Sequence, residues 1–121
     1  MNNRIRDVVF PIGYRWIIQQ SWFGFDEFTA FQPWYLLEDT KQFVVTDRWP
    51  DGLFPGILMA FARRQDNDEL ACFVIESKKV TQIVVVNGWT SSGYDILQTH
   101  NDFWDWMRSI IDDVAVWAEN T

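Results

Sequence analysis

The chain has 121 residues, of which 48% are hydrophobic and 17% aromatic, including eight Trp and ten Phe. This is enough apolar material for one folded domain spanning residues 1–121, and it argues against intrinsic disorder. The formal net charge of −7 disfavours binding to nucleic acid or to an anionic membrane surface, whereas a basic protein partner would suit it.

Turn-forming residues divide the first part of the chain into short elements. Pro11 and Gly13 interrupt a brief amphipathic pattern near the N-terminus. Residues 14–23 fit a helix or a strand, and their apolar spacing favours a helix. Residues 34–37 form an apolar cluster that we expect to pack under a sheet, and residues 43–46 read as a strand.

A polar segment between two apolar runs predicts a β-hairpin in the middle of the chain. The expected strands are residues 57–62 and 70–75, with a solvated tip between them. A second polar turn follows at residues 76–79, and the valine-rich stretch 80–86 is the clearest strand in the chain. We expect Asn87 and Gly88 to end that strand, and residues 89–99 to form a loop with at most a short strand at 94–97.

The last element predicted is an amphipathic helix of about four turns. Thr99 lies three residues before Asp102, which resembles a capping box that would begin the helix. Trp104 does not lie on the apolar face of this predicted helix. The residues predicted to form that face are Phe103, Met107, Ile110, Ile111, Val114 and Trp117.

Together these elements predict an α+β fold, in which an antiparallel, meander-like β-sheet packs against N-terminal helical segments and a C-terminal helix. We expect four hairpin residues to attach the sheet to that helix. These are Phe61, Leu70, Cys72 and Phe73.

Residue patterns for catalysis or metal binding are weak. Cys72, His100 and Asp102 form a nominal thiol triad, but Cys72 lies in the middle of a predicted strand, where nothing favours its thiolate. Counting from Asp66, a calcium-loop pattern fails, because its fifth and sixth positions are Leu70 and Ala71. We therefore predict no catalytic residue, no metal site and no cofactor.

Recognition of a partner remains as a role for the polar and aromatic residues. Arginine and tryptophan are common hot-spot residues at protein interfaces. The alternative, which the sequence leaves open, is that Arg63 and Arg64 only form local salt bridges with Asp66 or Asp68. The candidate partner-binding residues are Arg63, Arg64, Asp66, Asp68, Glu69, Trp89 and Trp104.

Residues 61–73, which read FARRQDNDELACF, resemble the strand–turn–strand of bacterial proteins in the SUKH superfamily, the group that includes Smi/Knr-type proteins. The valine-rich stretch 80–86, the Phe-Trp-Asp-Trp sequence at 103–106 and the cluster at 34–37 extend the resemblance over roughly residues 32–117. It implies a non-enzymatic domain and, for many bacterial members, an immunity protein that neutralises a cognate toxin. A general regulatory or scaffold protein is the alternative, and a small-ligand binder or enzyme with a Trp-lined pocket is a weaker one.

The cysteine content and the lengths of the apolar runs indicate the cellular compartment. Cys72 is the single cysteine, so no intrachain disulfide can form. The N-terminus lacks a secretory apolar segment, and no apolar run approaches the ~20 residues that span a bilayer. We expect a cytoplasmic protein that is a monomer or a homodimer, with no membrane contact.

Overall fold

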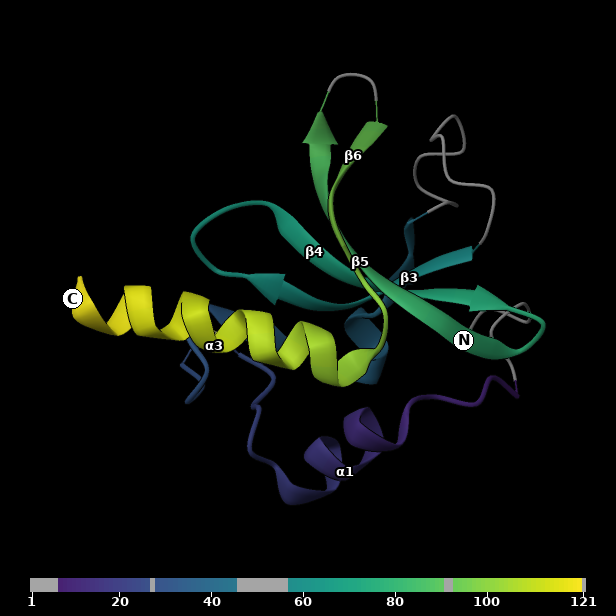
Figure 1. Cartoon of the computed structure of the whole chain (residues 1–121), viewed down its shortest axis with the longest axis horizontal. Helices are drawn as coiled ribbons and strands as arrows, with labels where there is room; N and C mark the ends of the chain where they lie inside the picture. Colours follow the sequence, from purple (N-terminus) through teal and green to yellow (C-terminus); the bar gives the residue numbers. More distant parts are fainter. Residues whose placement is uncertain (1–6, 27, 46–56, 91–92, 121) are drawn as a thin grey trace.

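The structure, a computed structural model, describes residues 7–26, 28–45, 57–90 and 93–120. It contains an antiparallel sheet, a short N-terminal helix and a long C-terminal helix (Figure 1), which confirms the α+β prediction. The elements in order are α1 (Ile12–Gln20), β1 (Trp34–Leu36), the 3₁₀ turn η2 (Asp39–Lys41), β2 (Phe43–Val44), β3 (Ile57–Arg64), β4 (Glu69–Glu76), β5 (Lys79–Thr90), β6 (Gly93–His100) and α3 (Phe103–Glu119).

The six strands form one sheet in the order β1-β3-β4-β5-β6, and β2 also pairs with β3. From β3 to β6 the sheet is a meander, as predicted, because each strand returns beside the one before it. Residues 34–36 do not pack under the sheet as we expected. They form the edge strand β1, in register with Ala62–Arg64 at the end of β3.

Strands β5 and β6 are longer than the sequence predicted. Asn87 and Gly88 do not end β5, which continues to Thr90, and the predicted loop after it contains the eight-residue strand β6. Backbone pairing with a neighbour explains the difference, since β5 bonds to β6 from Ile83 to Thr90 with irregular register around Gly88. The hydrogen-bonded ladder overrides the local turn propensity of Asn-Gly.

The two faces of the sheet carry separate apolar cores. Phe61 and Phe73 stack with ring centroids 4.0 Å apart on the face that packs against the helices. Leu70 and Cys72 lie in a second cluster with Leu37. Of the four hairpin residues expected to attach the sheet to α3, Phe61 contacts Phe103 and Trp106 of that helix, whereas Phe73 contacts Tyr14 of α1. The other two lie on the far face, because successive strand residues point to opposite faces.

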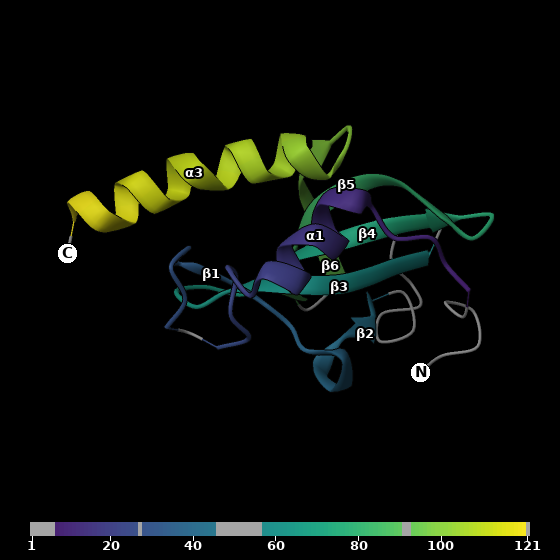
Figure 2. The ribbon, with the colours of Figure 1, turned by 90° about the horizontal axis from the view of Figure 1, so that it is seen from below.

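The C-terminal helix begins later and buries a slightly different face than predicted. Asp102, not Thr99, is its N-cap, and the Asp102 carboxylate accepts a hydrogen bond from Asp105 N at 2.8 Å. Trp106, which we did not place on the apolar face, is fully buried, whereas Ile111 is 51% exposed. Figure 2 shows that the C-terminal end of α3 extends beyond the sheet. Val116 in this part is 60% exposed, whereas Val114 and Trp117 are half-buried.

The N-terminal helix lies against the beginning of α3 (Figure 2). The helical prediction for residues 14–23 is confirmed, although the helix begins two residues earlier: Pro11 is the N-cap and Gly13 is the second helical residue. Pro is well suited to a helix start, because it lacks the N–H that would be unpaired there.

Candidate protein-interaction surface

The tip of the β3–β4 hairpin carries five of the seven predicted partner-binding residues. Arg63 and Arg64 end β3, Asp66 and Asp68 lie in the turn, and Glu69 begins β4. The polar segment between two apolar runs that predicted the hairpin thus places these charges together at one end of the sheet.

The Arg64 side chain forms ion pairs within the molecule. Its Nε lies 2.8 Å from Asp66 Oδ1 and its Nη2 lies 3.1 Å from Asp66 Oδ2, a bidentate pair. A second carboxylate, Asp113 on α3, approaches its Nη1 at 3.5 Å. The hydrogen bond from Arg64 lowers the pKa of Asp66 and raises the pKa of the guanidinium. The alternative that the sequence allowed, a local salt bridge with Asp66, is therefore present at Arg64.

Arg63 is more weakly held. Its Nη2 lies 3.8 Å from Asp68 Oδ1, and both side chains are exposed, at 41% and 55%. An exposed ion pair of this kind contributes only about 0–1 kcal/mol. The remaining turn residues bond to each other, because the Asn67 side chain donates to Glu69 Oε2 and accepts from Glu69 N. The turn is therefore ordered, while the Arg63 guanidinium stays accessible to a partner.

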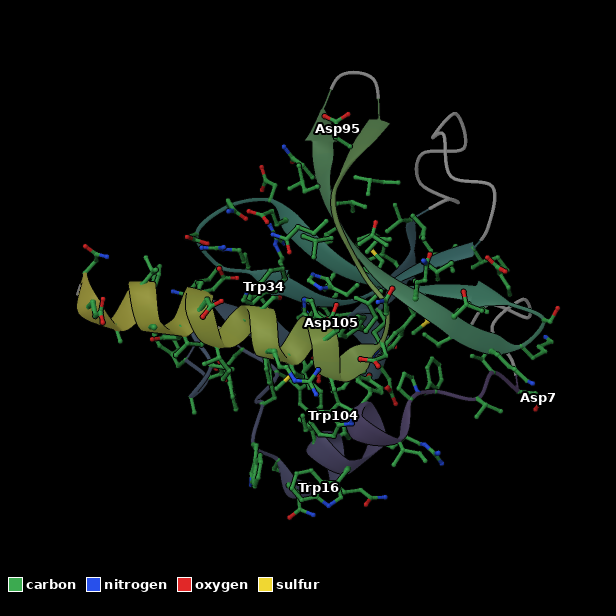
Figure 3. The ribbon with its side chains drawn as sticks, viewed as in Figure 1. Asp7, Trp16, Trp34, Asp95, Trp104 and Asp105 are labelled. Atoms are coloured by element: carbon green, nitrogen blue, oxygen red, sulfur yellow. The ribbon has the colours of Figure 1, made fainter. Side chains whose placement is uncertain are left out.

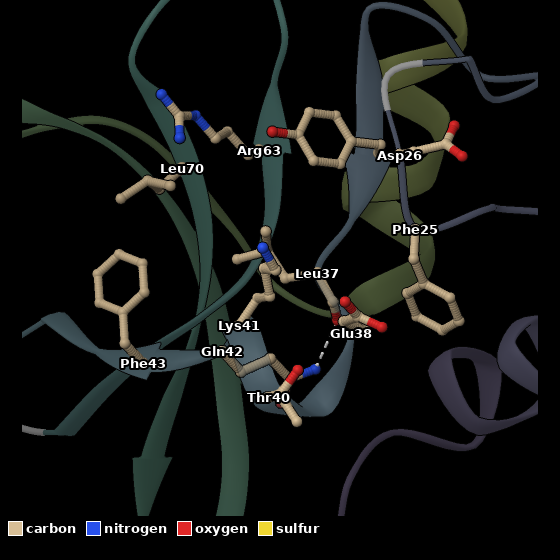
Figure 4. A pocket seen from close by; sticks show the side chains of 11 residues that line it. Phe25, Asp26, Leu37, Glu38, Thr40, Lys41, Gln42, Phe43, Arg63 and Leu70 are labelled. Atoms are coloured by element: carbon tan, nitrogen blue, oxygen red, sulfur yellow. Dashed lines mark hydrogen bonds between the residues drawn. The ribbon is translucent and has the colours of Figure 1, made fainter.

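Arg63 also lines an open groove of about 700 Å³ beside the hairpin, which we call the β3 groove (Figure 4). Aromatic and aliphatic side chains provide its apolar surface, and two acids and two bases lie among them. The lining residues are Phe25, Asp26, Tyr35, Leu37, Glu38, Thr40, Lys41, Gln42, Phe43, Arg63 and Leu70.

The β3 groove arises from the way the chain crosses the edge of β3. β1 and β2 pair with successive parts of the same edge, and the segment between them, with η2, leaves the sheet. Gln42 ties this segment down, since its Nε2 donates to Leu37 O at 3.1 Å and to Tyr14 Oη at 2.8 Å (Figure 4 shows the first bond). These two hydrogen bonds hold the segment that forms one wall of the groove.

The two predicted tryptophans are not both part of this surface. Trp104 lies in the first turn of α3 beside α1, away from the hairpin tip (Figure 3). It is 46% exposed, and its ring meets Phe103 edge-on at 5.8 Å. Trp89 lies in β5, but its side chain is outside the described part of the structure.

The nominal thiol triad is not assembled. Cys72 is fully buried, and burial raises the pKa of its thiol. His100 Nδ1 lies 3.2 Å from Asp105 Oδ2, and its Nε2 lies 3.0 Å from Gln98 Oε1, while Asp102 caps α3. Within the described residues, no three potential metal ligands cluster, and no helix is long and apolar enough to cross a membrane.

Comparison with family models, with curated proteins and with solved structures finds no match. The interaction surface is therefore defined by its own geometry. Sequence reasoning found Arg63 but missed Tyr35, Phe43 and Lys41, which share the groove with it. The sequence carried no signal for this, because Trp34, Tyr35 and Leu36 read as one apolar run. In the structure their burial alternates, and the edge strand turns Tyr35 outward.

Proposed function

We propose that this chain is a non-enzymatic protein-binding module of the SUKH superfamily, and that it acts in the cytoplasm as an immunity protein that binds and neutralises a cognate toxin. The hairpin tip and the β3 groove form the surface that contacts the toxin. The observation that carries the proposal is the position of Arg63, which belongs to both the charged tip and the aromatic groove.

The β3 groove has the composition of a recognition surface. Tyr35 and Phe43 are half-buried, so each ring keeps one accessible side against which a partner can pack. Lys41 and Glu38 are exposed beside them and supply charges of both signs. Aromatic anchors with neighbouring charges are typical of interface hot spots and of the polar rims around them.

The charge of the chain favours a basic partner. The chain carries a net charge of −7, and three of its acids lie at the hairpin tip: Asp66, Asp68 and Glu69. Further exposed acids lie on α3 at Asp112 and Glu119. An acidic surface accelerates encounter with a basic toxin domain, and this attraction weakens as salt is added.

Charge reversal at two ends of one hairpin tests the surface. Asp68 is exposed in the turn, whereas Glu76 is exposed at the far end of β4, about 25 Å away at the usual rise per strand residue. The partner to test is any basic toxin domain found encoded next to the gene of this chain. We expect Asp68→Lys to weaken binding to it by about tenfold. Glu76→Lys, which makes the same change of charge, should leave binding within about threefold.

Titration calorimetry with the purified toxin domain measures these affinities, and growth of cells that co-express toxin and chain measures neutralisation. Tyr35→Ala adds an uncharged test of the groove and should also weaken binding. The proposal is wrong if the wild-type chain neither binds nor protects, and the surface is wrong if Asp68→Lys and Glu76→Lys behave alike.

A general regulatory or scaffold role remains the alternative function. It predicts binding to a cellular protein with no protection against any toxin encoded nearby. A ligand binder or enzyme with a Trp-lined pocket is the weaker alternative. No Trp lines the β3 groove, and one Trp, Trp117, lines a smaller groove of about 230 Å³ beside Arg64 and Asp113. That reading predicts loss of a measurable activity on alanine substitution of His100 or Cys72.

A further inference from the structure

A second groove, which shares no lining residue with the β3 groove, lies where three distant parts of the chain meet. Its volume is about 380 Å³, and we call it the N-terminal groove. The segment before α1 forms one wall, anchored by the hydrogen bond from Val9 N to Lys78 O at 2.9 Å. The beginning of β5 and the beginning of α3 form the rest.

The walls of the N-terminal groove are mainly apolar. Phe10 and Val80 are half-buried, and Phe103 closes the groove from below as part of the main core. Val9 and Ile12 remain 60% and 77% exposed, although each lies on the groove. Binding of an apolar ligand that covers such side chains removes apolar surface from water, which is favourable.

Two cations stand on this groove in a chain that is otherwise strongly acidic. Arg15 and Lys79 both line it and are both exposed. Within the described part of the chain, neither forms an ion pair with a carboxylate. The one acid in the lining, Asp102, already accepts a hydrogen bond from Asp105 N as the cap of α3.

We propose that the N-terminal groove binds a carboxylate that carries an unbranched alkyl chain. Arg15 and Lys79 receive the carboxylate, and the alkyl chain covers Val9, Ile12 and Val80. The volume of the groove falls within the usual range for small-molecule sites. Each methylene that leaves water adds up to about fourfold to the affinity, while the two cations select an anion over a cation.

Binding of decanoate, below the concentration at which it forms micelles, tests this site. Amide chemical shifts of the ¹⁵N-labelled chain should move in a saturable way at residues 9–15 and 79–82. Acetate, which lacks the tail, and decyltrimethylammonium, which has the opposite charge, should produce much smaller shifts. Arg15→Gln and Lys79→Gln should each weaken decanoate binding by about threefold, and the double variant by about tenfold.

Matched controls remove a cation elsewhere. Lys41→Gln changes the β3 groove and Arg108→Gln changes the exposed face of α3, and neither should alter decanoate binding. The proposal fails if decyltrimethylammonium binds as well as decanoate, or if the double variant binds like the wild type. It also fails if decanoate does not bind. Where the same amide signals then depend on protein concentration, a second copy of the chain covers the groove instead.

Discussion

At the scale of single residues, Tyr14 shows how burial and hydrogen bonding control a titratable group. Its ring lies edge-on to Phe73 at 4.9 Å and to Phe61 at 5.6 Å, in the core between α1 and the sheet. Gln42 Nε2 donates to its hydroxyl oxygen at 2.8 Å. Burial dominates over this hydrogen bond and raises the pKa of Tyr14 to about 12. The neutral phenol is therefore the form that fits the folded protein.

This pKa predicts a specific loss of stability in alkali. Below pH 10 Tyr14 is protonated in both states, so it adds no pH dependence. Between pH 10 and about 12 only the unfolded state releases the proton, and the free energy of unfolding falls as pH rises. The loss should reach roughly 2 kcal/mol at the top of this range.

Urea unfolding of the wild type and of Tyr14→Phe between pH 8 and 12 measures this effect. The phenylalanine variant loses the ionisable group, so its stability should fall less steeply over the same range. Tyr35→Phe, at the surface of the β3 groove, is the matched control. Parallel pH profiles for the wild type and Tyr14→Phe would contradict the prediction.

At the scale of elements, Gly13 determines how closely α1 approaches α3. A Cβ atom at this position would lie 2.8 Å from Trp104 Cε2 and 2.9 Å from Phe103 Cδ2. Real Cβ atoms do not tolerate such distances, so a larger residue displaces the Trp104 and Phe103 rings or moves the two helices apart. The exposed Trp104 ring is thus used in helix packing.

Gly13→Ala should consequently destabilise the protein by about 1–3 kcal/mol, although alanine is the better helix former. Thermal or urea unfolding measures the change. Gly24→Ala is the matched control, since its Cβ would meet only Thr29 Cγ2, at 3.4 Å. The double variant Gly13→Ala/Trp104→Ala should lose less than the sum of the two single variants. Stabilisation by Gly13→Ala would show that α1 does not pack against α3 in this way.

At the scale of the whole molecule, one carboxylate connects the sheet to the C-terminal helix. Asp113 Oδ2 on α3 accepts a hydrogen bond from Trp34 Nε1 on β1 at 2.9 Å and lies 3.5 Å from Arg64 Nη1 on β3. The Arg64 guanidinium also lies 6.0 Å from the centre of the Trp34 ring. The edge strand, the hairpin tip and the helix are therefore joined at this point.

Asp113→Ala should lower the free energy of unfolding by about 1–2 kcal/mol, chiefly because the indole N–H of Trp34 loses its acceptor. Asp112→Ala, on the next helix position and exposed, should change it by less than about 0.5 kcal/mol. A double-mutant cycle of Asp113→Ala with Arg64→Ala should give a coupling energy below about 1 kcal/mol, because Arg64 keeps its pair with Asp66. Equal effects of the Asp112 and Asp113 substitutions would rule out this connection.

Local patterns were sufficient to predict the central hairpin, the first part of β5 and the amphipathic C-terminal helix. The strands are short apolar runs rich in β-branched residues, and the helix has an apolar period of about 3.6; both signals depend only on neighbouring residues. The polar tip of the hairpin followed from the polar segment between two apolar runs. For this reason Arg63, Asp66 and Asp68 could be named as surface residues before their positions were known.

Long-range contacts decided what these patterns leave open. β6 extends over eight residues because β5 offers it a hydrogen-bonded edge, although its own residues indicated only a short strand at 94–97 within a loop. The helices cover the face that carries Phe73, so Cys72 on the other face packs in the second core. The β3 groove brings Phe25, Lys41 and Arg63 together from separate elements. Such a groove depends on how the chain crosses a sheet edge, and no single stretch of sequence encodes that crossing.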